Sequence, residues 1–305
     1  SLADRASGRP RGITILDADG DGRQEARLQT AAMSVLVDPA EGGALTEWCL
    51  TGPRVNLLDT LSRTPEPYHE KLKAASVAAR VGAGGVPASI HDILGVKEPN
   101  LARHLIYDDQ RRSAFLDYGL QEPPRLEELV RSTWGERRLW SLEPFEWDAA
   151  PSRRAGQSAS GAEIAMVRRL PSGRIRKVVR VAADRPVLEC VYEVDGVTAP
   201  VVGLEFNVSL RDERYLSAAG EQPRAARFDI QEPGLGVSLV LELDPPGTLV
   251  HFPIETVSES EEGLERTYQG LALLCFWSPA PSGRGARGGR WTGRLRWTVQ
   301  TPRRR

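Results

Sequence analysis

Apolar and polar residues alternate in short segments along most of the chain. In "RIRKVVRVA" (174–182) and "GRLRWTV" (293–299), arginines hold one set of alternate positions, and mostly aliphatic or aromatic residues hold the other. A period of two is typical of strands in a sheet that has one face in water and one face on a core. Turn-forming stretches such as "LPSGR", "AADRP", "EPGLG" and "DPPGT" separate these segments. The pattern predicts antiparallel strands joined by short turns.

The other strand-like segments are "RLQTAAMSVLVD", "GALTEWCL", "AEIAMVRRL", "PVLECVYEV", "VVGLEFNVSL", "GVSLVLEL", "TLVHFPIETV" and "TYQGLALLCFW". Helical patterning is confined to "PYHEKLKAASVAAR" and "PPRLEELVRST", each with proline near its start. Ten or more strands with so few helices predict an all-β fold. We expect a large antiparallel β-sandwich with a short elaboration of loops and helices.

The chain of 305 residues divides into one large domain with short ends. We expect a disordered linker at residues 1–12, a single β-sandwich domain at 13–301 and a frayed tail at 302–305. Within the domain, residues 60–132 read as the loop and helix elaboration. The chain begins with serine, which indicates a fragment or a processed product.

Composition and charge narrow the class of partner. The net charge of −1 gives no overall attraction to nucleic acid or to anionic membranes. Cys49, Cys190 and Cys275 are odd in number and lie among apolar neighbours, which indicates free thiols in a reducing compartment, the cytoplasm. The longest apolar runs, such as "LALLCFW", are too short to span a bilayer, and we find no signal peptide.

An acidic loop, "DADGDGRQE", precedes the first of these strand-like segments. Asp17, Asp19 and Asp21 alternate, and Glu25 follows four residues later. Three carboxylates at this spacing suit calcium, but an EF-hand has glutamate at its twelfth position and Leu28 stands there. Two interpretations remain open. One is a structural calcium held by Asp17, Asp19, Asp21 and Glu25, and the other is an acidic turn whose aspartates bind their own backbone.

Two polar clusters are candidates for a binding surface. The first, in "RTPEPYHEKL", contains Arg63, Glu66, Tyr68 and His69. The second, in "SIHDILGVKEPNLARHLIYDDQRRSAFLDY", contains His91, Asp92, Tyr107, Asp108, Arg111 and Asp117. Such residues suit sugar recognition, in which planar polar groups bind hydroxyls, but they equally suit a network of salt bridges within the elaboration. Neither cluster has the spacing of a zinc site.

These segments, with the acidic loop before them, resemble the C-terminal domain of family 57 glycoside hydrolases, which include 4-α-glucanotransferases and α-amylases. The resemblance runs from about Ile15 to Tyr118 and continues in "GLEFNVSL" (203–210). It implies a β-sandwich of the galactose-mutarotase superfamily. It also implies a catalytic (β/α) barrel upstream, in cis or in trans, as the source of the two catalytic carboxylates. The two clusters would then face that barrel or an α-glucan.

The resemblance therefore predicts a non-catalytic accessory domain that supports the barrel and binds α-glucan or maltooligosaccharide. No segment of this chain matches those that supply the carboxylate pair of the barrel, so we expect no independent cleavage of glucan. Such a domain should expose an apolar patch where the barrel docks.

An alternative is a stand-alone mutarotase-like or epimerase-like enzyme. It would need an acid such as His91, His69 or His251, and a base such as Glu205 or Glu255, in one concave pocket. A third interpretation, nucleic-acid binding by the Arg- and Trp-rich segment "RGARGGRWTGRLRW", conflicts with the net charge. Trp134, Trp140 and Trp147 could form a sugar platform or part of a core.

Overall fold

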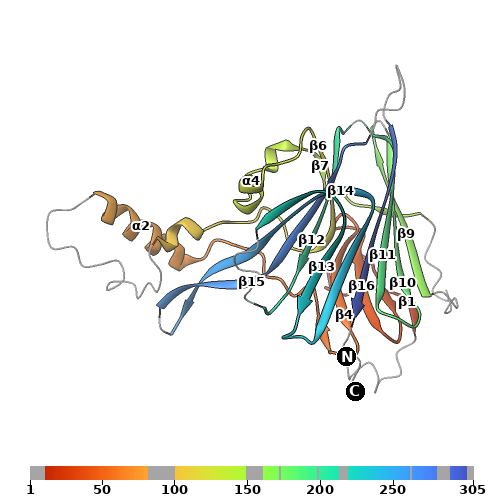
Figure 1. Cartoon of the computed structure of the whole chain (residues 1–305), viewed down its shortest axis with the longest axis horizontal. Coiled ribbons are helices and arrows are strands. Elements are labelled where there is room, and N and C mark those ends of the chain that lie inside the picture. The colour runs from red at the N-terminus through yellow and green to blue at the C-terminus, as the bar shows by residue number, and fades with distance from the viewer. Residues whose placement is uncertain are drawn as a thin grey trace.

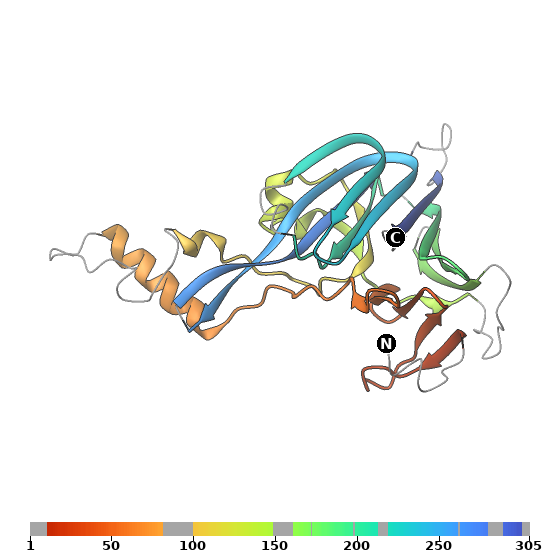
Figure 2. The same cartoon turned by 60° about the horizontal axis from the view of Figure 1, so that its bottom comes forward.

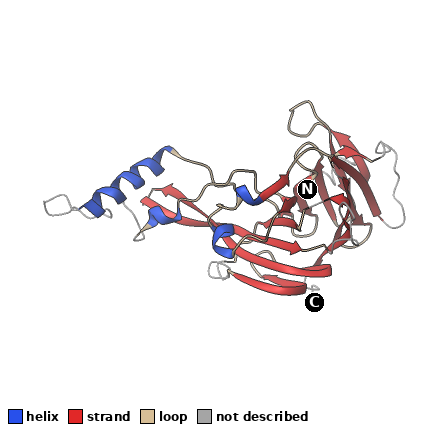
Figure 3. Ribbon diagram, turned by 90° about the horizontal axis from the view of Figure 1, so that it is seen from above, coloured by secondary structure: helices blue, strands red, loops and turns tan. Residues whose placement is uncertain are grey.

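A computed structural model of the chain describes residues 11–81, 100–148, 161–171, 173–197, 199–212, 219–261, 263–279 and 289–300. Sixteen strands form one continuous hydrogen-bonded sheet, and every strand pair is antiparallel. Figure 3 shows that strands make up the body and that helices lie at one end and on one flank. The predicted fold class is confirmed. The expected linker and tail lie largely outside the described residues.

The strands in chain order are β1 (Gly12–Leu16), β2 (Glu25–Gln29), β3 (Met33–Asp38), β4 (Ala44–Leu50), β5 (Val55–Asn56), β6 (Ala114–Leu120), β7 (Arg138–Ser141), β8 (Glu146–Trp147), β9 (Gly161–Leu170), β10 (Gly173–Ala182), β11 (Val187–Val197), β12 (Val201–Val208), β13 (Gly220–Glu232), β14 (Val237–Ser260), β15 (Gly263–Trp277) and β16 (Gly289–Gln300). The helices in the described residues are α2 (Pro67–Val81) and the short α4 (Leu126–Val130), with 3₁₀ turns η1 (Leu101–His104) and η2 (Gly135–Arg137).

Strand β14 joins the two layers of the sandwich. Its first part, from Ser238 to Asp244, pairs with β16, whereas its second part, from Thr248 to Ser260, pairs with β15. The segment "DPPGT" lies between these parts, so it is the corner at which the strand changes neighbours. The prediction that the chain reverses direction in a turn there was wrong. Strand β13 pairs with β14 on both sides of the corner, with register shifts between the paired stretches.

A second correction concerns "RLQTAAMSVLVD", which reads as one strand but forms β2 and β3. The hydroxyl of Thr30 accepts hydrogen bonds from the backbone N–H groups of Ala32 and Met33. The backbone N–H of Thr30 donates to the Met33 carbonyl at 2.9 Å. Local side-chain bonds of this kind favour a turn over a continuous strand.

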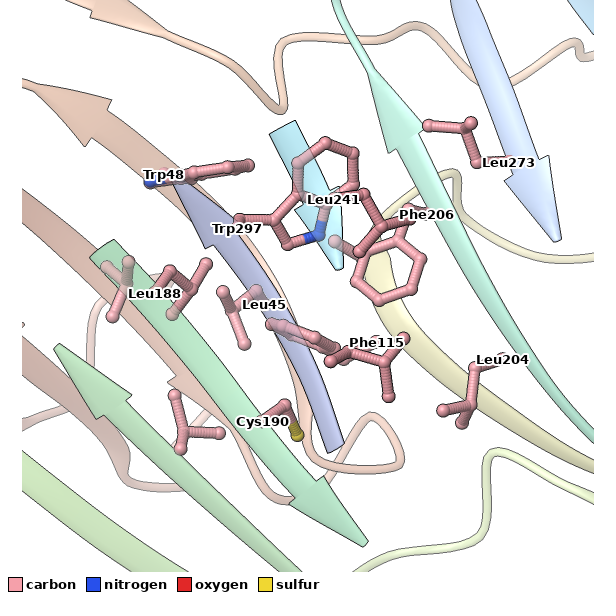
Figure 4. Packing of buried hydrophobic residues seen from close by; sticks show 14 of the residues in the cluster. Leu45, Trp48, Phe115, Leu188, Cys190, Leu204, Phe206, Leu241, Leu273 and Trp297 are labelled. Carbon is pink, nitrogen blue, oxygen red and sulfur yellow. The ribbon is translucent and has the colours of Figure 1, made fainter. Parts of the chain in front are cut away.

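The main core lies between the two layers. Trp48, Trp297, Phe206 and Phe115 pack there in succession, with Trp48 and Trp297 ring centroids 5.7 Å apart and Trp297 and Phe206 centroids 5.6 Å apart (Figure 4). All four residues are almost fully buried. Edge-to-face aromatic contacts of this kind add to the stabilisation from apolar burial.

A second apolar cluster covers the outer face of the central strands β6, β12, β15 and β14. Phe252, Leu274 and Tyr118 on those strands pack with Leu129 of α4 and with Trp134. Strand β6 itself falls within residues 60–132, so that segment is not only loop and helix. Strand β6 pairs with β12 in the interior of the sheet. The sequence prediction missed this strand because polar residues of the second cluster come directly before it.

An arm projects from the sandwich (Figures 1 and 2). We define the arm as α2, η1 and the distal part of the β14–β15 hairpin, residues 255–261 and 263–268. Among the described residues, the core of the arm consists of Leu72, Leu101, Val257 and Leu264. Two extended connections join it to the sandwich: the inbound connection, residues 57–66, and the return connection, residues 105–113. None of the described helices is long and apolar enough to cross a membrane.

Candidate functional site: a buried ion-pair network beneath a projecting arm

The inbound and return connections are fastened together by Arg63 and Asp108. The backbone N–H of Asp108 donates to the Arg63 carbonyl at 2.8 Å, and the Arg63 N–H donates to the Asp108 carboxylate at 2.9 Å. The Arg63 guanidinium also donates to that carboxylate from Nε and Nη2. Both side chains are nearly inaccessible to water. The sequence prediction placed these two residues in separate clusters, and the structure brings them together.

Arg112 extends this network into the sheet. Its guanidinium donates to Asp108 at 2.6 Å, to Glu205 of β12 at 2.8 Å and to the Asn207 side chain at 3.2 Å. The Tyr118 hydroxyl donates to the second oxygen of Glu205 at 2.8 Å. We call these residues, Arg63, Asp108, Arg112, Tyr118, Glu205 and Asn207, the mount network. Two guanidinium groups and two carboxylates balance its formal charge.

The ionisation of the mount network follows from its burial. Burial alone would raise the pKa of Asp108, but hydrogen bonds from Arg63 and Arg112 outweigh it and hold that pKa well below its usual range. Burial would lower the pKa of Arg112, yet Glu205 and Asp108 raise it. Burial and the Glu205 charge raise the pKa of Tyr118. Asp108 and Arg112 are therefore charged at neutral pH, whereas Tyr118 keeps its proton and donates.

Asp117 belongs to a second buried cluster, in the core between the layers. Its carboxylate accepts from Lys177 Nζ at 2.9 Å and from Arg168 at 2.5 Å. Lys177, which is 0% exposed, also donates to the carbonyls of Gly42, Gly43 and Phe115. Burial lowers the pKa of Lys177, while Asp117 favours its charged form. Asp117 is 1% exposed, and both of its oxygens are bound by these internal groups.

His69 and Tyr68 attach α2 to the hairpin of the arm. The Glu66 backbone N–H donates to His69 Nδ1 at 3.1 Å, so the ring proton lies on Nε2, which donates to the Val257 carbonyl at 3.0 Å. The Tyr68 hydroxyl donates to the same carbonyl at 3.2 Å. Tyr107 contacts His69 from the return connection, with its hydroxyl 3.3 Å from Nδ1. These predicted site residues hold the arm together.

The remaining predicted residues are scattered. The Glu66 side chain is exposed, and Arg111 is exposed beside Glu41, with a nearest separation of 3.8 Å. His91 and Asp92 lie outside the described residues, so their role stays a prediction. Trp134 and Trp140 are buried, and the Arg138 guanidinium covers the Trp134 ring at 4.2 Å, so neither ring is an open platform for sugar.

The aspartates of the acidic loop accept hydrogen bonds from backbone N–H groups of the same loop. Asp17 accepts hydrogen bonds from the N–H groups of Gly20 at 2.7 Å and Gly22 at 3.1 Å, and Asp21 accepts from Arg23 at 2.7 Å. One oxygen from each of Asp17, Asp19 and Asp21 also lies within 4.8 Å of the others, and all three residues are exposed. Both interpretations of the loop therefore keep support, and calcium stays a prediction.

Glu25 has a different role in that loop. It is buried, and one carboxylate oxygen accepts from the Ala18 N–H at 2.5 Å. Burial raises the pKa of Glu25, although the Ala18 hydrogen bond opposes the shift. Glu25 thus closes the turn from inside, while the three aspartates face water.

For the mutarotase-like alternative, neither candidate base, Glu205 or Glu255, shares its hollow with a described histidine. The hollow beside Glu205 has a volume of about 10 Å³, room for about one water molecule, and contains no histidine. A hollow of about 650 Å³ beside Glu255 also contains none, and Glu255 pairs with Arg266. Glu205 is 2% exposed and bound by Arg112 and Tyr118.

The Arg- and Trp-rich segment at the C-terminal end proves to be structural where it is described. Trp291 and Trp297 are buried, whereas Arg294 and Arg296 are exposed on the other face of β16. Arg296 pairs with Glu189 at 2.9 Å. The strand lies in the interior of the sheet, because β16 is hydrogen-bonded to β11 on one side and to β14 on the other.

The described strands define a large antiparallel β-sandwich. The model of one protein family, described as Alpha-amylase/4-alpha-glucanotransferase, C-terminal, matches residues 17–284. The chain belongs to this family, and the resemblance found in its motifs is confirmed at that level.

The relatives agree with this assignment. The chain is 28% identical over 287 residues to Alpha-amylase 1 of Dictyoglomus thermophilum, a match that covers 87% of this chain and 39% of the relative. It is 30% identical over 263 residues to the 4-alpha-glucanotransferase of Thermococcus kodakarensis, covering 86% and 38%. The crystal structure of the Thermococcus litoralis 4-alpha-glucanotransferase superposes with a TM-score of 0.71 at 20% identity, covering 97% of this chain and 40% of that chain. The chain thus spans about two fifths of the length of these relatives.

Proposed function

We propose that this chain is the non-catalytic accessory domain of an α-glucan-active enzyme, and that it supports a catalytic domain in cis or in trans. The observation that carries the proposal is the family match over residues 17–284 in a chain that spans only about two fifths of its relatives. The relatives are named α-amylases and 4-α-glucanotransferases. The larger, unmatched part of those enzymes would then contain the catalytic groups.

The state of the buried carboxylates supports a non-catalytic role. A retaining glycosidase needs two carboxyl groups about 5–5.5 Å apart that face a substrate cleft. Asp108, Asp117 and Glu205 are instead each bound by buried guanidinium or ammonium groups. Carboxylates held in this way stabilise a scaffold and offer no free oxygen for attack or proton transfer.

We extend the proposal to weak binding of α-glucan. The names of the relatives give the substrate class, and neutral oligosaccharides suit a chain whose net charge is only −1. The buried free thiols of Cys190 and Cys275 support a reducing compartment, the cytoplasm.

The test is an overnight incubation of the purified chain with maltoheptaose, followed by chromatography of the products. We expect the chain lengths to be unchanged, with weak binding detected by affinity electrophoresis in a maltooligosaccharide gel. A redistribution of chain lengths that depends on the concentration of the purified chain would overturn the non-catalytic role. Unretarded migration in the gel would remove the glucan-binding part alone.

A further inference from the structure

We infer that the outer surface of residues 59–61, centred on Leu61, and the adjoining start of the arm are where the catalytic part of the enzyme docks. This inference rests on the proposed function, since it names the surface through which the chain would support that part. The partner is the portion that the relatives contain beyond the region matched by this chain.

The surface is held in place from behind. Arg63 and Asp108 fasten the inbound connection to the return connection, and the Arg112 N–H donates to the Ser62 hydroxyl at 2.8 Å. Arg112 in turn binds Glu205 within the sheet. An extended segment with few regular hydrogen bonds is thus anchored to the sandwich at consecutive residues, which pre-organises its outer side for binding.

The outer side of this segment is open, and its exposed side chains are those of Asp59 and Leu61. Leu61 is 60% exposed, and the other large apolar side chain exposed on the described part of the chain is Leu139, at 45%. Within that part, Asp59, Thr60 and Leu61 make no backbone–backbone hydrogen bond, and the buried Thr60 hydroxyl has no partner. An extended backbone with free donors and acceptors can be paired by another chain.

The geometry of the molecule favours a docked domain over a small ligand. Figure 2 shows strands β1 and β2 and the inbound connection on the same lower side of the molecule, with the arm extending beyond them. Close to Leu61, Thr64, Pro65, Glu66 and Glu70 are exposed, so the surface is mixed in polarity.

Mixed polarity also explains why the expected apolar patch is missing from the described part of the chain, where Leu61 and Leu139 are the exposed large apolar residues. Interfaces between domains of one enzyme bury about 600–1,500 Å² and are more polar than those of obligate dimers. One exposed leucine as an anchor within a polar rim fits an interface of that kind.

The test places the photo-crosslinking residue p-benzoylphenylalanine at position 61 of the complete enzyme, and at position 139 as the matched control. Cross-linked peptides are then identified by mass spectrometry. We expect position 61 to cross-link to the catalytic part and position 139 to give no such product. Cross-links from position 61 to a second copy of this chain, or the same yield from both positions, would overturn the inference.

A second measurement separates docking from folding. Leu61→Asp and Leu139→Asp should leave the melting temperature of the isolated chain unchanged, because both side chains are exposed. In the complete enzyme, Leu61→Asp should make cleavage between the two parts by a limiting protease about tenfold faster, and Leu139→Asp should not. Equal cleavage rates for both variants would overturn the docking surface and leave the proposed function standing. Only turnover of maltoheptaose by the isolated chain would contradict the non-catalytic role itself.

Discussion

Arg63 and Asp108 lie 45 residues apart in sequence and bind each other through both their backbones and their side chains. The Arg63 Nη2 to Asp108 Oδ1 distance is 2.6 Å, and both side chains are buried. Because one residue lies on the connection that enters the arm and the other on the connection that leaves it, the pair closes the base of the arm. Arg112 then ties that base to β12 through Glu205.

Replacement of Asp108 should strongly destabilise the fold. Asp108→Asn leaves two buried guanidinium groups without their shared counter-ion, and removal of one partner from a buried pair costs about 3–5 kcal/mol. Asp109→Asn is the matched control, because Asp109 is half exposed and pairs with Arg138 at the surface; it should cost under about 1 kcal/mol. Urea unfolding of both variants at pH 7 measures the difference. Equal losses of unfolding free energy in the two variants would mean that the buried ion pair contributes no more to stability than the exposed one.

The same substitution should flatten the acid limb of the stability profile. The folded-state pKa of Asp108 lies below its unfolded value, which is about 3.9. The unfolded chain therefore binds the proton more readily, and the stabilisation is present above about pH 4 and lost as the pH falls below it. Wild type should lose stability more steeply than Asp108→Asn between about pH 5 and pH 2. Parallel slopes would assign the acid sensitivity to other groups.

Replacement of Lys177 should lower the free energy of unfolding about as much as replacement of an apolar core residue. Lys177→Met removes the donor to Asp117 and to the carbonyls of Gly42, Gly43 and Phe115. Buried acceptors left without a donor should cost about 3 kcal/mol in the free energy of unfolding. The control is Lys73→Met, since Lys73 pairs with Glu70 at the surface. A stable Lys177→Met protein would show that the apolar side chain fills the site without loss.

Alternation along the chain was enough to predict the fold class and strands such as β10 and β16, which bury one face. Strands β6 and β12 are buried on both faces, and the sequence prediction missed β6. The same alternation held an unused signal for Lys177. In "RIRKVVRVA" it occupies the series of Ile175, Val179 and Val181, which point into the core. A lysine on the core side of a strand predicts a buried counter-ion. The sequence could therefore have suggested this cluster, although not the identity of its partners.

Other features depend on which distant segments contact each other in the fold, and the local sequence pattern does not determine those contacts. Arg63 and Asp108 were both candidate residues, but nothing in their spacing pairs them across 45 positions. The corner of β14 carries every local signal of a turn. The chain nevertheless continues as one strand through this corner. On one side β13 pairs with β14 both before and after the corner, and on the other side β16 pairs with β14 before it and β15 after it.

Loss of His69 should loosen the arm locally. His69→Ala removes the bond to the Val257 carbonyl and the acceptor for the Glu66 N–H, in an arm whose own core has four buried apolar residues. Hydrogen exchange in residues 67–74 should become about tenfold faster, equivalent to about 1.4 kcal/mol, while the sandwich stays protected. His104→Ala in η1 is the control. Unchanged exchange in α2 would mean that Tyr68 and Leu72 suffice to hold the helix.

The acidic loop gives the last test. If Asp17, Asp19 and Asp21 bind calcium, the ion stabilises only the folded chain, where their oxygens lie within 4.8 Å, and stability rises with the ratio of its concentration to Kd. We expect 10 mM calcium to raise the melting temperature relative to chelator, and Asp19→Asn to abolish the difference. Because burial raises the pKa of Glu25, a bound cation nearby should also lower that pKa and stabilise the loop more at pH 7 than at pH 5. Magnesium at the same concentration controls for ionic strength. Identical melting in calcium and chelator would leave the hydrogen bonds from Gly20, Gly22 and Arg23 as the whole reason for the aspartates.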